Sequence, residues 1–225
     1  RMVRHPHGRL AFDEVSVLFA DGRVVIAETS VEIALGERVL IVGESGAGKS
    51  TLFRALAGLW PWGTGTVMQP DPDTMMFMPQ RPYLPLGTLR AALAYPDAPN
   101  AFSSTAIEGA LKRVGLAEFL SMLDVPARLD KSLSLGQQQL IGFARLLLHR
   151  PCWVFLDEAT SALDELSQKR VMSMFDEELA GATVVSIGHR PGLEAFHPRV
   201  LHLVRSPRGA RLQHGPVRSR AAALA

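Results

Sequence analysis

The chain has 225 residues, and its 24 Lys and Arg against 22 Asp and Glu give a formal net charge of +2. This length suits one large domain or two small ones, and a composition of 47% hydrophobic and 20% charged residues excludes a disordered chain. The near balance of charge argues against a nucleic-acid partner, and a lone Cys152 excludes an internal disulfide or a cysteine-rich metal site.

The first half of the chain predicts strands, a glycine-rich loop and one helix. Alternating or continuous apolar residues predict strands at 10–18, 24–26, 38–42 and 75–78. The glycine-rich loop follows the third of these strands and leads into a helix over 49–58. Residues 1–9 are expected to be an N-terminal extension, and the start at Arg1 instead of Met suggests a piece cut from a longer chain.

The second half begins with helices and then returns to strands alternating with helices. Helices are expected at 88–94, 105–115, 117–123 and 135–149, which we interpret as a helical subdomain over 88–150. Strands at 152–156, 183–187 and 200–204, a helix at 165–179 and a short helix near Pro191 follow. We therefore predict an α/β core over 10–87 and 151–215, with a parallel sheet and antiparallel N-terminal strands, and a flexible tail over 216–225.

Residues 43–50, Gly-Glu-Ser-Gly-Ala-Gly-Lys-Ser, match the phosphate-loop motif G-x-x-x-x-G-K-[ST] at every fixed position. The motif follows an apolar run and opens a helix, as it does in P-loop NTPases. Its backbone N–H groups would point at phosphate oxygens, Lys49 would add a positive charge, and the Ser50 hydroxyl suits Mg²⁺. The alternative is a glycine-rich turn without a ligand. The candidate nucleotide-binding residues here are Gly43, Ser45, Gly46, Gly48, Lys49, Ser50 and Thr51.

Two carboxylates, Asp157 and Glu158, end the apolar strand that begins near Cys152. The carboxyl end of a parallel strand opens onto the crevice where α/β sheets bind ligands. Asp157 is therefore a candidate metal ligand, and Glu158 could orient or deprotonate an attacking water. Alone, the pair could equally be an acidic cap at a helix N-terminus.

The segment 133–139, Leu-Ser-Leu-Gly-Gln-Gln-Gln, resembles the L-S-G-G-Q signature of ATP-binding cassette (ABC) proteins. Further motifs of that family match in order over residues 10–205. Gln80 resembles the Q-loop glutamine, Ser161 and Asp164 resemble the D-loop, and His189 resembles the switch histidine. Phe19 stands where the family often has an aromatic that stacks on adenine, although a core position for this ring is as good an interpretation.

Residues 79–90 and 133–136 narrow the resemblance to one exporter-type branch, the peroxisomal acyl-CoA half-transporters and their bacterial relatives. The excess of Arg over Lys suggests a bacterial genome. Two departures from the family pattern are Leu135, in place of the usual middle glycine, and Leu140, in place of the usual Arg.

The resemblance implies an ATPase that uses ATP and Mg²⁺. Two cassettes would sandwich two ATP molecules, each held by one phosphate loop and by Ser134, Gly136 and Gln137 of the other cassette. Ser50, Gln80 and Asp157 would hold the metal; Glu158, His189 and Gln80 would be catalytic.

The resemblance also implies a membrane partner. A transmembrane domain, N-terminal in the same full-length chain, would place the cassette at the cytoplasmic face of a membrane, here the bacterial inner membrane. The apolar residues 83–86 are a candidate docking loop, unless they pack inside the helical subdomain. The alternatives are a soluble ABC ATPase without a membrane partner and a degenerate cassette that binds ATP without cleaving it.

Overall fold

The computed structural model describes residues 1–190 and 192–214. It divides into two compact units, which we call the sheet unit and the helical unit. The sheet unit comprises Arg1–Phe77, Cys152–Glu158 and the described residues from Ala182 onward, and the helical unit comprises Met78–Pro151 and Ala159–Gly181. The predicted tail at 216–225 lies outside the described residues.

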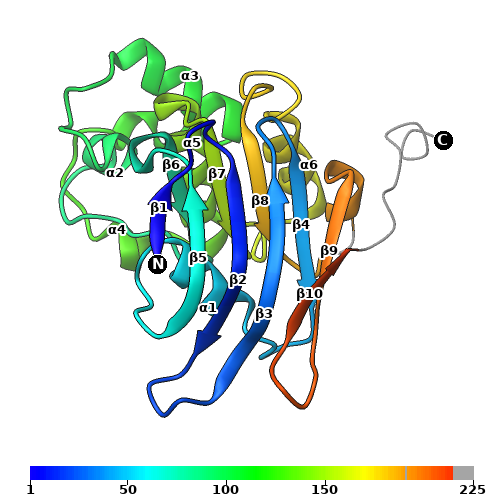
Figure 1. Cartoon of the computed structure of the whole chain (residues 1–225). Coiled ribbons are helices and arrows are strands. Elements are labelled where there is room, and N and C mark those ends of the chain that lie inside the picture. The colour runs from blue at the N-terminus through cyan, green and yellow to red at the C-terminus, as the bar shows by residue number, and fades with distance from the viewer. Residues whose placement is uncertain (191, 215–225) are drawn as a thin grey trace. The chain divides into compact units, whose positions relative to one another are not determined.

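The N-terminal part of the sheet unit is a four-stranded sheet in the order β1–β5–β2–β3 (Figure 1). Strand β2 is antiparallel to both β3 and β5, as predicted for the N-terminal strands, and β1 runs parallel to β5. The strands are β1 (Met2–Arg4), β2 (Leu10–Leu18), β3 (Val24–Ile33) and β5 (Gly63–Gln69).

The second sheet has six strands in the order β10–β9–β4–β8–β7–β6. Strand β4 is parallel to β8 and β9, and β7 is parallel to β8, which confirms the predicted parallel core. Strand β10 is antiparallel to β9. The strands are β4 (Arg38–Gly43), β6 (Met75–Met78), β7 (Trp153–Asp157), β8 (Thr183–Ile187), β9 (Arg199–Val204) and β10 (Arg211–His214).

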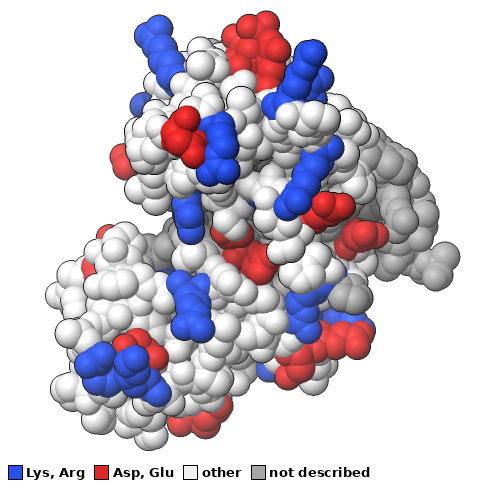
Figure 2. Space-filling view, turned by 90° about the horizontal axis from the view of Figure 1, so that it is seen from below, with Lys and Arg blue, Asp and Glu red and all other residues white. Residues whose placement is uncertain are grey.

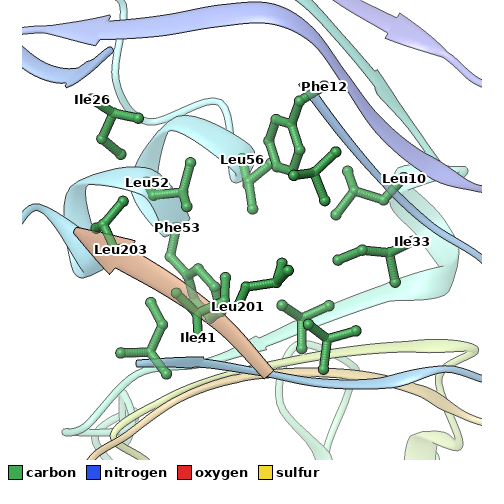
Figure 3. Packing of buried hydrophobic residues seen from close by; sticks show 14 of the residues in the cluster. Leu10, Phe12, Ile26, Ile33, Ile41, Leu52, Phe53, Leu56, Leu201 and Leu203 are labelled. Carbon is green, nitrogen blue, oxygen red and sulfur yellow. The ribbon is translucent and has the colours of Figure 1, made fainter. Parts of the chain in front are cut away.

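One apolar core joins the two sheets to helix α1 (Lys49–Leu56). Figure 3 shows Leu52, Phe53 and Leu56 of α1 between the side chains of β2 and those of β4 and β9. The fully buried strands β7 and β8 add Phe155 and Val185 to the same cluster. This packing fixes α1, and with it the loop that precedes α1, against the carboxyl ends of the parallel strands.

The helical unit consists mainly of helices, as predicted for the middle of the chain. They are α2 (Leu89–Ala94), α3 (Ser104–Val114), α4 (Leu129–Ser132), α5 (Leu135–His149), α6 (Glu165–Ser173) and the 3₁₀ helix η2 (Ala117–Met122). Thr88, Ser103 and Ser134 each accept a backbone hydrogen bond as N-cap residues of α2, α3 and α5. The unit also contains residues 159–181, which the sequence had assigned to the α/β core.

Several predicted boundaries were wrong. The helix expected over 165–179 ends at Ser173, because i→i+3 bonds such as Phe175 N–H to Met172 O replace the α-helical pattern. The segment 117–123 is a 3₁₀ helix, and the short helix near Pro191 is the 3₁₀ helix η3 (Leu193–Phe196).

Strands β1, β5 and β10 were not predicted at all. Strand β5 contains Gly63 and Gly65, which are unfavourable strand residues, but a Cβ at Gly65 would lie 2.4 Å from the Glu14 carbonyl oxygen. The close approach of β2 therefore requires glycine there.

Lys and Arg side chains lie beside Asp and Glu on the face shown in Figure 2. Ion pairs in the described part of the chain include Arg9 with Glu32 and Arg90 with Asp124. Of the helices in the described part of the chain, none has the length and apolar character needed to cross a membrane.

Candidate nucleotide site

The phosphate loop, residues 43–50, connects β4 to α1 through two glycines in the left-handed region. Gly46 has φ 72° and Gly48 has φ 100°, values that side chains rarely tolerate. A Cβ on Gly48 would also lie 2.6 Å from Cγ1 of Val25 on β3. Local backbone geometry and packing against β3 therefore both require glycine at this position.

The ammonium group of Lys49 is held by the loop itself. Lys49 Nζ donates hydrogen bonds to the carbonyl oxygens of Gly43 at 2.7 Å and Glu44 at 2.8 Å, and the residue is buried. These two bonds fix a positive charge at the N-terminus of α1, where the helix dipole is also positive. The arrangement is suited to an anion.

A second cation, Arg205, lies against the outside of the phosphate loop. Its Nη2 donates to the Ser45 carbonyl oxygen at 2.8 Å, and its Nε lies 3.7 Å from Oε2 of Glu44. Arg205 follows β9 and was not among the residues predicted from sequence. Its hydrogen bond constrains the peptide between Ser45 and Gly46.

Ser50 and Asp157 form a pair of hard oxygen donors. Ser50 Oγ donates to Asp157 Oδ1 at 3.1 Å, which joins the first turn of α1 to the end of β7. Burial raises the pKa of Asp157, and the nearby charge of Glu158 raises it further, whereas the hydrogen bond from Ser50 lowers it. A divalent cation would relieve this cost of burying the carboxylate, so the donor pair fits Mg²⁺.

Glu158 has a strained backbone conformation at the end of β7. Its φ is 51°, unusual for a non-glycine residue, and its N–H donates to the Ile187 carbonyl oxygen at 2.9 Å. Its Oε1 lies 3.5 Å from Nδ1 of His189, which follows β8. The structure thus brings the predicted base and the predicted switch histidine together.

Below His189, the buried His197 fixes the end of β8. Its Nε2 lies 2.7 Å from Ser186 Oγ and its Nδ1 lies 2.8 Å from the Leu193 carbonyl oxygen. Burial lowers the pKa of His197 to about 4, although the bond to Leu193 acts in the opposite direction. A neutral imidazole therefore holds η3 against the strand that positions His189.

The phosphate loop, Glu158 and His189 line a cavity of about 660 Å³, within the size range of ligand pockets. Its lining contains all the predicted nucleotide residues of the sheet unit. The lining residues are Phe19, Val25, Gly43, Ser45, Gly46, Gly48, Lys49, Ser50, Thr51, Glu158 and His189.

Phe19 is part of this cavity and not of the core. The residue is 39% exposed, its ring makes an edge contact with Trp60 at 6.2 Å between centroids, and Arg23 lies over the ring at 5.3 Å. The core interpretation of Phe19 was therefore wrong. The position leaves the ring available to a planar group in the cavity.

In the helical unit, the signature segment forms the N-terminus of α5. Ser134 and Gln137 form a capping box, with Ser134 Oγ accepting from Gln137 N–H at 3.2 Å and Gln137 Oε1 accepting from Ser134 N–H at 2.9 Å. Gly136 lies so close to the next motif that a Cβ there would be 2.9 Å from the Ala162 carbonyl oxygen. The predicted glycine thus has a packing reason within the unit.

The predicted Q-loop and D-loop residues also meet in the helical unit. Gln80 Nε2 donates to Ser161 Oγ at 3.3 Å. Asp164 caps α6, because its Oδ1 accepts from Ser167 N–H at 2.7 Å, and these bonds from Ser167 lower the pKa of Asp164. The six predicted residues of this unit are Gln80, Ser134, Gly136, Gln137, Ser161 and Asp164.

The two departures from the family pattern, Leu140 and Leu135, differ in burial. Leu140 is 8% exposed and belongs to the buried face of α5, which explains why an apolar residue is tolerated at this position. Leu135 is partly buried in the first turn of α5.

In the apolar loop 83–86, Leu84 is buried whereas Tyr83 and Leu86 are 60% and 73% exposed. The alternative that the whole loop packs inside the helical unit is therefore wrong for Tyr83 and Leu86.

Sequence reasoning missed three residues with direct contacts to the motifs: Val25, Gln139 and Arg205. Gln139 is fully buried and bonds to both the Q-loop and the D-loop. The only available signal was its position in the glutamine run 137–139, and that run contains nothing to show which glutamine faces inward. Val25 and Arg205 carried no motif signal.

Comparison with known proteins gives one consistent family. Residues 26–161 match the family model described as ABC transporter. The chain is 41% identical over 184 residues to an uncharacterized ABC transporter ATP-binding protein of Synechocystis, covering 80% of this chain and 28% of that protein. It is 36% identical over 208 residues to ABC transporter D family member 1 of Arabidopsis thaliana, covering 85% of this chain and 15% of that protein.

A solved structure supports the same assignment. The structure of a bacterial Atm1-family ABC exporter with ATP bound matches with a TM-score of 0.82 and 28% identity, covering 99% of this chain and 40% of that chain. The chain therefore spans only about a third or less of the length of the first relatives that it matches.

Proposed function

Because the chain belongs to the ABC transporter family, we propose that it binds and hydrolyses ATP to power transport by a membrane domain. The observation that carries this proposal is the cavity lined by the phosphate loop, Phe19, Glu158 and His189. Its volume and chemistry suit a nucleoside triphosphate. The match to the structure of an ABC exporter with ATP bound supports this choice of nucleotide.

Different residues of the cavity bind different parts of ATP. The N–H groups of the phosphate loop and the N-terminus of α1 receive the phosphates, and Lys49 exchanges its loop carbonyls for phosphate oxygens. The Phe19 ring stacks on the adenine.

Ser50 and Asp157 would hold Mg²⁺, and Gln80 is proposed as a further ligand. Mg²⁺ would neutralise negative charge on the phosphates, and it usually takes only one or two protein ligands beside phosphate oxygens and water. This fits the described residues, in which no group of three or more His, Cys, Asp and Glu could hold a metal by itself.

Hydrolysis requires a base close to the attacking water. Glu158 is proposed as that base, since its carboxylate lines the cavity and the backbone bond to Ile187 fixes its position. His189 lies 3.5 Å from this carboxylate and would hold the water and the γ-phosphate. Asp157, one residue earlier, has its carboxylate bonded to Ser50 and is therefore proposed as a metal ligand instead of the base.

We also propose that two copies of the cassette close on two ATP molecules. Ser134, Gly136 and Gln137 form a capped helix N-terminus, which provides N–H groups and a positive dipole end for the γ-phosphate held by the other copy. Ser161 and Asp164 would contribute to the same dimer contact. Hydrolysis removes the shared phosphate and lets the dimer open.

The transport partner is proposed to be a transmembrane domain, N-terminal in the full-length chain. The exposed Tyr83 and Leu86 offer it an apolar contact, and Arg90 beside them is fixed by two hydrogen bonds to Asp124. The cassette would then work at the cytoplasmic face of a membrane, in a bacterium at the inner membrane. The bacterial relatives support this location.

The test is phosphate release by the purified chain with ATP, with and without Mg²⁺, together with light scattering before and after ATP is added. We expect Mg²⁺-dependent release and an ATP-dependent increase in mass from monomer to dimer. Absence of phosphate release would contradict the ATPase proposal, and a stable dimer without nucleotide would contradict the switch.

A further inference from the structure

The side chain of Gln139 lies at the centre of the helical unit's motifs, and none of the established motif roles includes it. It belongs to the second turn of α5 and is completely buried. A buried carboxamide is costly unless its N–H and C=O groups have partners. The partners of Gln139 therefore indicate why a polar residue is tolerated here.

The Gln139 side chain bonds to two other motif segments. Its Nε2 donates to the Gln80 carbonyl oxygen at 2.9 Å and to Ser161 Oγ at 3.1 Å. Its Oε1 accepts from the Ala162 N–H at 3.0 Å. One carboxamide therefore satisfies both of its donors and its acceptor on the Q-loop and the D-loop.

Two neighbouring contacts close the same arrangement. Gln80 Nε2 donates to Ser161 Oγ at 3.3 Å, so the two loops also bond to each other. One turn before Gln139, Gly136 packs against the Ala162 carbonyl, where a Cβ would approach to 2.9 Å. The signature helix thus contacts the D-loop through both backbone packing and the Gln139 amide.

We propose that Gln139 is a positioning residue that fixes the Q-loop and the D-loop to the signature helix, so that the three motifs move as one body. This inference rests on the proposed ATPase function, because it concerns the rate of that reaction. It assigns Gln139 no contact with nucleotide. Loss of the amide would leave the phosphate loop intact but remove the three bonds by which α5 holds Gln80 and the D-loop.

The experiment compares Gln139→Met with a matched control, Gln168→Met. Gln168 is also a buried glutamine of the helical unit, but it lies on α6 outside the three motif segments. For Gln139→Met we expect kcat to fall about 10- to 100-fold, as for partners that orient functional ligands. The KM and the dissociation constant for ATP should stay within about twofold. Gln168→Met should leave kcat within about twofold.

A second variant separates positioning from simple loss of stability. Ser161→Ala removes one partner of Gln139 and keeps the other two, so kcat should fall by less than in Gln139→Met. The double variant should be no slower than Gln139→Met alone, because both changes break the same network. If Gln139→Met does not fold, a fall in kcat of at least about threefold in Ser161→Ala with unchanged ATP-dependent dimerisation supports the proposal. An unchanged kcat, or a fall that comes with weaker dimerisation, overturns it.

Other outcomes have distinct meanings. The proposal is overturned if Gln139→Met keeps the parent's kcat, or if its effects simply add to those of Ser161→Ala. It is also overturned if Gln168→Met has the same melting temperature as Gln139→Met and lowers kcat by as much. Failure of the parent chain itself to release phosphate would instead contradict the proposed function.

Discussion

The two units hold their functional groups by different means. In the sheet unit, backbone geometry builds the site, through left-handed glycines, the N-terminus of α1 and loop carbonyls that hold Lys49. In the helical unit, side chains do so, through the Ser134–Gln137 capping box and the Gln139 amide. The difference teaches that the anion site depends on glycine and loop conformation as well as on Lys49, whereas the joined loops depend on the side chains that bond them.

The largest expected effect comes from Glu158→Gln, the one change that alters chemistry in the sheet unit without altering its backbone. We expect kcat to fall about 10²- to 10⁴-fold, because general-base catalysis contributes that much. ATP affinity should be unchanged, and the ATP-bound dimer should persist in light scattering. The matched control is Glu28→Gln on the exposed face of β3. A parent-like rate in Glu158→Gln would remove Glu158 as the base.

The next effect concerns His197, whose neutral imidazole supports the His189 strand. Its pKa is about 4 in the fold, below the ordinary value of 6.5, so the unfolded chain takes up the proton first as the pH falls. Stability is therefore complete above pH 6.5 and is lost as the pH falls towards 4. Between pH 7 and pH 5 the contribution of His197 to the free energy of unfolding should drop by about 2 kcal/mol.

Urea unfolding of the parent and of His197→Gln at both pH values measures this contribution. The raised pKa of Asp157 acts in the opposite direction in both proteins, so the difference between them isolates His197. An equal pH dependence in the two proteins would show that His197 is not the group responsible.

Lys49→Ala tests whether the loop needs one side-chain charge in addition to its backbone. Charged hydrogen bonds contribute about 1.5–3 kcal/mol, so ATP affinity should fall about 10- to 150-fold in calorimetric titration. The control is Lys169→Ala, an exposed lysine paired with Glu165 on α6. An affinity equal to the parent's would mean that the backbone alone binds the phosphates.

The smallest effect is expected for Ser134→Ala, which removes the cap of α5. The free energy of unfolding should fall by about 1 kcal/mol, as for other N-cap substitutions. Ser103→Ala, which removes the cap of α3, should cost about the same. Only Ser134→Ala should also weaken ATP-dependent dimerisation, and equal dimerisation by both variants would contradict the proposed role of the signature helix.

The sequence predicted which residues meet in the sheet-unit cavity, because each motif there is a short continuous segment. Residues 43–50 determine the loop by themselves, and the end of a buried strand predicts where Asp157 and Glu158 emerge. His189 was expected near them because it follows another strand of the parallel sheet, and the carboxyl ends of parallel strands share one edge. The convergence of the phosphate loop, Glu158 and His189 was therefore predictable before any contact was known.

The contacts that were missed all depend on packing between distant segments. Gln139 looks like its two neighbours in sequence, and only the fold decides that it faces Gln80 and Ser161. Arg205 lies 160 residues from Ser45, whose carbonyl it contacts, so no local pattern could reveal it. Strand β5 was missed because its glycines weaken the strand pattern while serving the close approach of β2.

The aromatic cluster beside Phe19 gives the protein a built-in optical reporter. Of the three tryptophans, Trp60 and Trp62 lie 5.5 Å apart between ring centroids, with Trp60 against the Phe19 ring, and Trp153 is 1% exposed in the core. Trp60 contacts Phe19, which lines the cavity, so its emission should change when a ligand contacts that ring, whereas emission from Trp153 depends on the integrity of the fold. A single unlabelled chain thus carries separate fluorescence signals for ligand entry and for unfolding.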